Sequence, residues 1–150
     1  MESLYDQDFY RWALRNAELM REGKLSEIDT ENIAEELEAM GKSQKRELIS
    51  RLSVLIMHLL KWRYRSQNRG DSWVGTIMEQ RTEIGLLIED SPSLKNEIEK
   101  SMGRAYSLAM IKFEKETKIA AKDLPASCPY SFDRTMDSDF WPESDQTRAE

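Results

Sequence analysis

The chain has 150 residues, of which 39% are hydrophobic and 33% charged, with a net charge of −6 and a single cysteine. This length suits one domain that buries about 70% of its unfolded surface, and the apolar content excludes global disorder. The lone Cys128 excludes an internal disulfide and any site that needs two thiols. We expect a single domain over residues 1–142, followed by a flexible tail over residues 143–150.

The hydropathy pattern argues against membrane insertion. The longest apolar run, residues 54–60, is interrupted by His58 and is far shorter than the roughly 20 residues that span a bilayer. Near the N-terminus, Asp6, Asp8 and Glu18 occupy a stretch where a secretory signal would have a basic start and then an uninterrupted apolar segment. We therefore expect no transmembrane helix and a cytosolic location.

The first third of the chain predicts two helices. Asp6 is a candidate N-cap for a helix over residues 6–22, which Gly23 would end. Asp29 or Thr30 would cap a short acidic second helix, in which Gly41 marks a stop or a bend. Whether this second helix and the third are one bent helix is left open by the sequence.

The remaining elements also have helical periodicity. A third helix is predicted over residues 43–65, and its apolar residues surround so much of it that it belongs at the centre of a bundle. A fourth would begin at Asp71 or Ser72, and a long fifth at Ser91-Pro92. An aromatic segment from Cys128 to Trp141 would follow as an irregular strap. The predicted fold is an all-α antiparallel bundle of about five helices with a C-terminal strap.

Several short sequence words resemble one bacterial family, the domain of unknown function 29. They are Tyr5-Asp6-Gln7-Asp8-Phe9 with Trp12, Asn32-Ile33-Ala34-Glu35-Glu36-Leu37-Glu38 with Met40-Gly41, Leu59-Leu60-Lys61-Trp62, Ser72-Trp73, Asp90-Ser91-Pro92-Ser93-Leu94 and Cys128-Pro129-Tyr130. Their order and their span of about residues 5–130 match that family. The resemblance implies an α-helical fold and a bacterial source, and it assigns no role to any residue.

Charge is distributed unevenly along the chain. Residues 42–69 contain eight cations and one anion, Glu47, which gives this stretch a charge of +7. Clustered cations of this kind can bind phosphates, although charge runs on helices are more often solvated surface. The candidate anion or nucleic-acid contacts are Lys42, Lys45, Arg46, Arg51, His58, Lys61, Arg63, Arg65 and Arg69.

Two alternative roles for these charges remain open. An acidic stripe of Glu31, Glu35 and Glu38 could pair within the molecule with a basic stripe of Arg51, His58 and Arg65. A metal site is the other alternative, with Glu31, Glu35, Glu79 and Glu83 as its helical candidates. The Glu-x-x-His repeat of di-iron bundles is absent, because the one histidine follows Leu55 at that spacing. We expect no cofactor and assign no metal-binding residue.

The motifs of common enzymes are absent from the sequence. It contains no glycine-rich phosphate loop, nucleophile elbow or zinc-binding pattern, and we assign no catalytic residue. The favoured hypothesis is therefore a non-enzymatic protein-binding or adaptor domain that acts through protein partners or self-association. Nucleic-acid binding through residues 42–69 is the alternative, and a carboxylate-rich metal-dependent enzyme is the third hypothesis.

Overall fold

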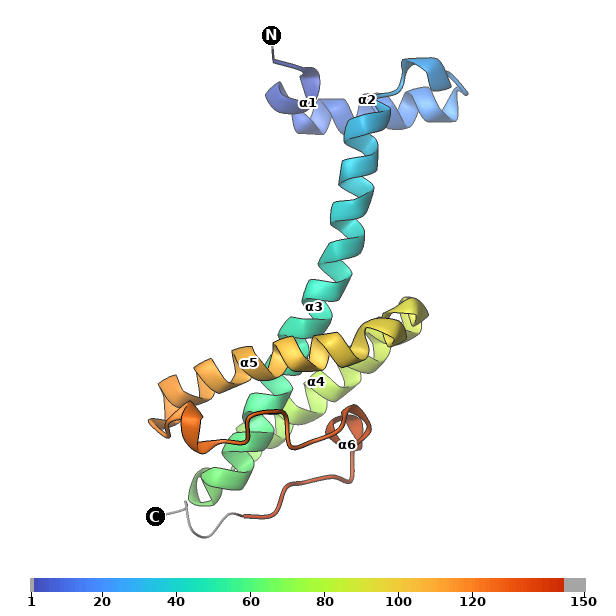
Figure 1. Cartoon of the computed structure of the whole chain (residues 1–150). Coiled ribbons are helices and arrows are strands. Elements are labelled where there is room, and N and C mark those ends of the chain that lie inside the picture. Colours follow the sequence, from blue (N-terminus) through green and yellow to red (C-terminus); the bar gives the residue numbers. More distant parts are fainter. Residues whose placement is uncertain (1, 145–150) are drawn as a thin grey trace. The chain divides into compact units, whose positions relative to one another are not determined.

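The computed structural model describes residues 2–144, and this part of the chain is mostly helical, with no strand. The predicted all-α class is confirmed. In chain order the elements are α1 (Leu4–Gln7), α2 (Phe9–Arg21), the 3₁₀ turn η1 (Leu25–Glu27), α3 (Thr30–Tyr64), η2 (Ser66–Asn68), α4 (Asp71–Asp90), η3 (Pro92–Glu97), α5 (Ile98–Thr117), η4 (Ala121–Asp123) and α6 (Phe132–Met136) (Figure 1). Within residues 2–144, no helix is long and apolar enough to cross a membrane.

The chain divides into two compact units, Met1–Ser43 and Gln44–Glu150. We call them the N-terminal unit and the C-terminal unit. The single domain expected over residues 1–142 stays a prediction. Of the flexible tail expected over residues 143–150, the part from residue 145 onward lies outside the described residues.

The predicted first helix is interrupted at Asp8. Ser3 caps α1, and its side chain accepts a hydrogen bond from the Asp6 backbone N–H. Asp8 leaves the helical conformation, with φ −151° and ψ 84°, and its carboxylate accepts from the Arg11 backbone N–H at 3.0 Å. The expectation of one helix capped by Asp6 was wrong, because Asp8 is the residue that caps α2. Gly23 ends α2 at φ 76°, as expected.

Polar contacts hold the start of α3 against α2 in the N-terminal unit. The Trp12 indole donates to the Asp29 carboxylate at 2.9 Å, and the Asn32 amide donates to the same carboxylate at 2.8 Å. These two hydrogen bonds, that of Asn32 first, hold the pKa of Asp29 below its usual value. The buried Asn16 accepts from the Asp29 backbone N–H at 2.8 Å, and Tyr5 donates to Glu36. Tyr5, Asn32 and Glu36, which belong to the motifs that resemble the family, thus have structural roles in this unit.

The helix α3 continues through Gly41, so the predicted second and third helices are one helix and Gly41 is neither a stop nor a break. A single glycine without left-handed backbone geometry weakens a helix by about 1 kcal/mol and does not end it. A Cβ at Gly41 would meet nothing within 4 Å. The residue therefore lowers the stability of α3 without serving a packing contact.

We predict that Gly41→Ala stabilises α3 by about 0.5–1 kcal/mol, because alanine loses less backbone freedom than glycine and fits the open space. Amide hydrogen exchange over residues 37–45 measures this effect. The matched control is Gly23→Ala, which should destabilise by about 1 kcal/mol because its φ of 76° disfavours a Cβ. Equal effects of the two substitutions would contradict the prediction.

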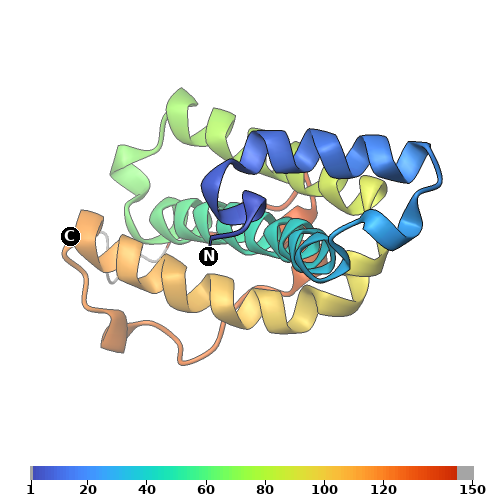
Figure 2. The ribbon, with the colours of Figure 1, turned by 90° about the horizontal axis from the view of Figure 1, so that it is seen from above.

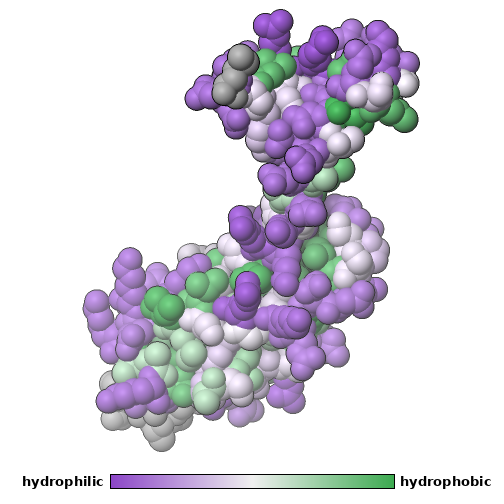
Figure 3. Space-filling model, turned by 45° about the horizontal axis from the view of Figure 1, so that its top comes forward, coloured by the Kyte–Doolittle hydropathy of each residue, from purple (hydrophilic) through white to green (hydrophobic). Residues whose placement is uncertain are grey.

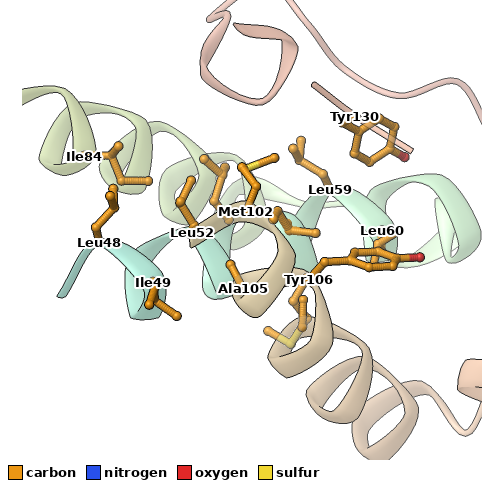
Figure 4. Close-up of a cluster of buried hydrophobic side chains, with 14 of the residues drawn as sticks. Leu48, Ile49, Leu52, Leu59, Leu60, Ile84, Met102, Ala105, Tyr106 and Tyr130 are labelled. Atoms are coloured by element: carbon orange, nitrogen blue, oxygen red, sulfur yellow. The ribbon is translucent and has the colours of Figure 1, made fainter. Parts of the chain in front are cut away.

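The core of the C-terminal unit is built around the C-terminal half of α3, which lies between α4 and α5 (Figure 2). Leu52, Leu55 and Leu59 are fully buried on α3, as their spacing predicted. Leu48 of α3 and Ile84 of α4 point toward each other in this cluster (Figure 4). The small Ala105 and Ala109 of α5 are fully buried, which permits a close approach of this helix.

The starts of α4 and α5 differ in detail from the prediction. Gly70 is the N-cap of α4 and has no side chain to cap it, whereas Asp71 or Ser72 was expected there. After Ser91, the chain first forms the 3₁₀ segment η3, and α5 begins only at Ile98. Leu94 of η3 is buried in the core, so the 3₁₀ turn contributes to packing.

The segment after α5 runs back along the C-terminal unit as the predicted aromatic strap, with the short α6 within it (Figure 1). Leu124 and Tyr130 are buried in the core. The guanidinium of Arg81, on α4, holds this strap: it donates to the carbonyl oxygens of Thr135 and Phe140, both at 2.8 Å. Burial lowers the pKa of Arg81. One buried arginine thus ties a helix to an irregular segment.

Candidate functional site

Several of the predicted basic residues contact acidic side chains of different elements within the C-terminal unit. Lys45 pairs with Glu97 of η3 at 3.0 Å, and Arg51 pairs with Glu47 at 3.4 Å and with Glu83 of α4 at 3.8 Å. Most of these cations therefore have structural partners.

The cations near the C-terminal end of α3 also contact groups of the C-terminal unit. Arg65 donates to the Thr117 carbonyl oxygen at 2.7 Å, and Arg69 donates to the Trp62 carbonyl oxygen at 2.8 Å. Arg63 lies over the Tyr64 ring at 5.3 Å. These contacts connect α3 to α5 and to its own C-terminal turn.

The sequence left open an intramolecular pairing of the acidic and basic stripes. The ion pairs of Arg51 use Glu47 and Glu83 instead of the acidic stripe. Since Glu31, Glu35 and Glu38 lie on the same continuous helix α3, the two stripes are not opposing faces of a helix pair. The acidic stripe lies in the N-terminal unit and its residues are exposed.

Lys61 and Arg65 line one small pocket of about 380 Å³, together with Trp73 of α4 and Glu116 of α5. Lys61 lies over the Trp73 ring at 4.9 Å and pairs with Glu116 at 3.8 Å. The carboxylate of Glu116 offsets one of the two cations in the lining, so the pocket keeps only one net positive charge to attract an anion.

His58 lies beside this pocket as a boundary residue of the core. Its Nδ1 hydrogen-bonds with the Val54 carbonyl oxygen at 2.8 Å. Burial lowers its pKa, and the nearby Lys61 lowers it further. A neutral histidine with this local hydrogen bond is the structural arrangement expected from its apolar helix.

A second, less neutralised surface is the groove between α3 and α5, with a volume of about 500 Å³. Three cations line it: Arg46 from α3, and Arg104 and Lys112 from α5. None of its lining residues is acidic. Lys112 donates to the Ser53 hydroxyl at 3.3 Å. Within residues 2–144, none of the three cations forms an ion pair.

Apolar groups make up the rest of this groove, which we call the α3/α5 groove. Ile49 and Leu108 contribute aliphatic carbons, and Ser50, Ser53 and Ser107 contribute hydroxyl groups. Aliphatic stems of arginine and lysine extend the apolar surface while their charged ends reach solvent. The groove therefore combines an apolar floor with a cationic rim.

A family model described as "Domain of unknown function DUF29" matches residues 4–141 of the chain. The chain belongs to this family. The resemblance inferred from the sequence words is thereby confirmed. No curated protein matches this DUF29 chain, and no solved structure matches it.

The basic residues singled out in the sequence of this DUF29 chain include Arg46 of the α3/α5 groove but not its other two cations, Arg104 and Lys112. The basic stretch of residues 42–69 does not include α5, where anions accompany the cations and the average charge is small. A signal was present: Lys100, Arg104, Leu108 and Lys112 follow one another at intervals of four and so lie along one row of α5. That row faces the groove through Arg104, Leu108 and Lys112.

The predicted metal candidates and the single cysteine can also be placed in the described part of this DUF29 chain. Across residues 2–144, no three His, Cys, Asp or Glu side chains are placed to hold a metal ion. Thus Glu31, Glu35, Glu79 and Glu83 are not gathered into one cluster there. Burial raises the pKa of the Cys128 thiol, which favours its protonated form over the nucleophilic thiolate.

Proposed function

We propose that this DUF29 chain is a non-enzymatic protein-binding domain of the bacterial cytosol whose α3/α5 groove binds an acidic, amphipathic segment of a partner protein. The single observation that carries the proposal is the set of three cations without an ion-pair partner within residues 2–144, around an apolar floor. Carboxylates of a partner would neutralise Arg46, Arg104 and Lys112. Its apolar side chains would cover Ile49 and Leu108.

The chemistry of the groove favours a peptide over a nucleic acid. Nucleic-acid surfaces attract through many phosphate contacts, and single strands add stacking on aromatic rings. The α3/α5 groove has no aromatic residue in its lining, and much of its surface is aliphatic. An amphipathic helix laid into a groove places its apolar row on such a floor and its charges on the rim.

A designed helical peptide with leucines at intervals of three and four and glutamates elsewhere is the probe for this proposal. Fluorescence anisotropy should show that it binds, and Arg104→Glu should weaken binding roughly tenfold or more, since attraction becomes repulsion at one contact. The control Lys122→Glu makes the same charge change on exposed η4, outside the groove, and should leave the affinity nearly unchanged.

A second variant separates the peptide from nucleic acid. Leu108→Ser removes apolar surface without changing charge, so it should weaken the peptide and leave a short DNA duplex unaffected. Failure of the peptide to bind, or equal binding by the Arg104→Glu variant, would reject the proposed function. Salt-sensitive DNA binding with no peptide binding would instead support the nucleic-acid hypothesis for residues 42–69.

A further inference from the structure

The N-terminal unit buries very little apolar surface of its own. Among residues 2–43, Trp12 and Leu19 are the buried hydrophobic residues. Seven large hydrophobic side chains of the same unit are exposed: Phe9, Tyr10, Leu14, Met20, Leu25, Leu37 and Met40. Apolar surface is visible among the hydrophilic side chains of this unit (Figure 3). A unit of this size with so small a core usually gains stability from a partner surface.

The charge balance of the sequence changes at the boundary between the two units. Residues 1–43 contain eleven Asp and Glu against five Lys and Arg, whereas residues 44–150 contain seventeen of each. The whole net charge of −6 therefore belongs to the N-terminal unit. Within it, residues 27–40 hold six carboxylates and no cation.

The first turns of α3 combine this acidity with exposed apolar side chains. Leu37 is 61% exposed and Met40 is 64% exposed, and their spacing of three places both on one helical face. Glu36 and Glu38 flank Leu37 on either side, and Glu36 accepts a hydrogen bond from Tyr5. This stretch is an acidic amphipathic helix, which is the chemistry that the α3/α5 groove fits.

We infer that the α3/α5 groove of one copy binds the acidic stretch of α3, residues 30–40, of a second copy of this chain. The inference rests on the proposed function and names its partner. In it, Leu37 and Met40 cover the apolar floor, and glutamates of the same stretch face Arg46, Arg104 and Lys112. Pairing of two N-terminal units with each other is disfavoured, because each carries −6. Reciprocal exchange between two copies closes the assembly as a dimer.

The test is the mass of the full-length protein in solution, measured by light scattering during gel filtration. The wild type should be a dimer. Leu37→Ser with Met40→Ser, and separately Arg104→Glu, should each give monomers, since each removes one side of both contacts. The controls Ile111→Ser and Lys122→Glu change exposed residues outside the groove lining and should remain dimers.

Mixing the two monomeric variants tests whether the groove and the acidic stretch bind each other. A mixed pair keeps one intact contact, between the groove of the Leu37→Ser, Met40→Ser copy and the acidic stretch of the Arg104→Glu copy. A 1:1 mixture should therefore form heterodimers, which misfolded variants would not. A monomeric wild type would overturn the inference, as would a dimer that resists Arg104→Glu. If the wild type is monomeric yet the designed acidic peptide binds the groove, the proposed function stands and self-association alone fails.

Discussion

Phe113→Ala should lower the free energy of unfolding of the C-terminal unit by about 3–5 kcal/mol, the usual cost of removing a buried phenylalanine side chain. Phe113 is fully buried on α5 and packs edge-on against Tyr64 of α3, with ring centroids 5.9 Å apart. Its removal leaves a cavity where α3 and α5 meet. Urea unfolding followed by tryptophan fluorescence measures the loss, because Trp62, Trp73 and Trp141 lie in this unit.

The matched control for this substitution is Ile111→Ala on the same helix. Ile111 is 65% exposed, so its truncation should change the free energy of unfolding by no more than about 0.5 kcal/mol. The two variants make similar chemical changes and differ mainly in burial. Comparable losses in both would show that α5 does not pack through Phe113 as described.

Arg81→Met should release the C-terminal strap. Arg81 is only 7% exposed, and its two hydrogen bonds satisfy the carbonyl oxygens of Thr135 and Phe140. Methionine fills much of the same space but donates nothing, so each carbonyl left unpaired in a buried place costs roughly 1–3 kcal/mol. We expect a lower urea midpoint and faster proteolysis within residues 129–142.

Arg134→Met serves as the control for the strap, because Arg134 is exposed and its guanidinium lies over the Phe140 ring at 5.6 Å from the centroid. It should cost less than about 1 kcal/mol. A strap equally resistant to protease in the wild type and in Arg81→Met would mean that apolar packing of residues such as Tyr130 holds it without the arginine.

Periodicity predicted the core of the C-terminal unit because burial on a helix is a local property of sequence. Leu48, Leu52, Leu55 and Leu59 repeat at helical spacing, and all four are fully buried. The positions at which a helix is interrupted were harder to predict. Asp6 and Asp8 are both good caps, and only the backbone geometry at Asp8 decides between them. At Gly41, the helical preference of its neighbours outweighs the cost of one glycine.

The groove could be predicted only in part, because it depends on how two helices lie against each other. Arg46 belonged to the conspicuous basic stretch, whereas Arg104 and Lys112 are separated from it by more than fifty residues in the chain. Their row on α5 was readable, but the side of α5 that meets α3 was not. Conversely, Arg51 and Lys61 looked available in the sequence, and their ion pairs with glutamates of other helices could not be foreseen.

The most direct measurement of the central claim is an NMR titration of the isotope-labelled protein with the designed acidic amphipathic peptide. Binding in the α3/α5 groove predicts that the largest chemical-shift changes fall on Ser50, Ser53, Ser107 and Leu108, and that they are much smaller at the same peptide concentration in the Arg104→Glu variant. Shifts confined to other surfaces, or no shifts at peptide excess, would contradict the assignment of this groove as a protein-binding site.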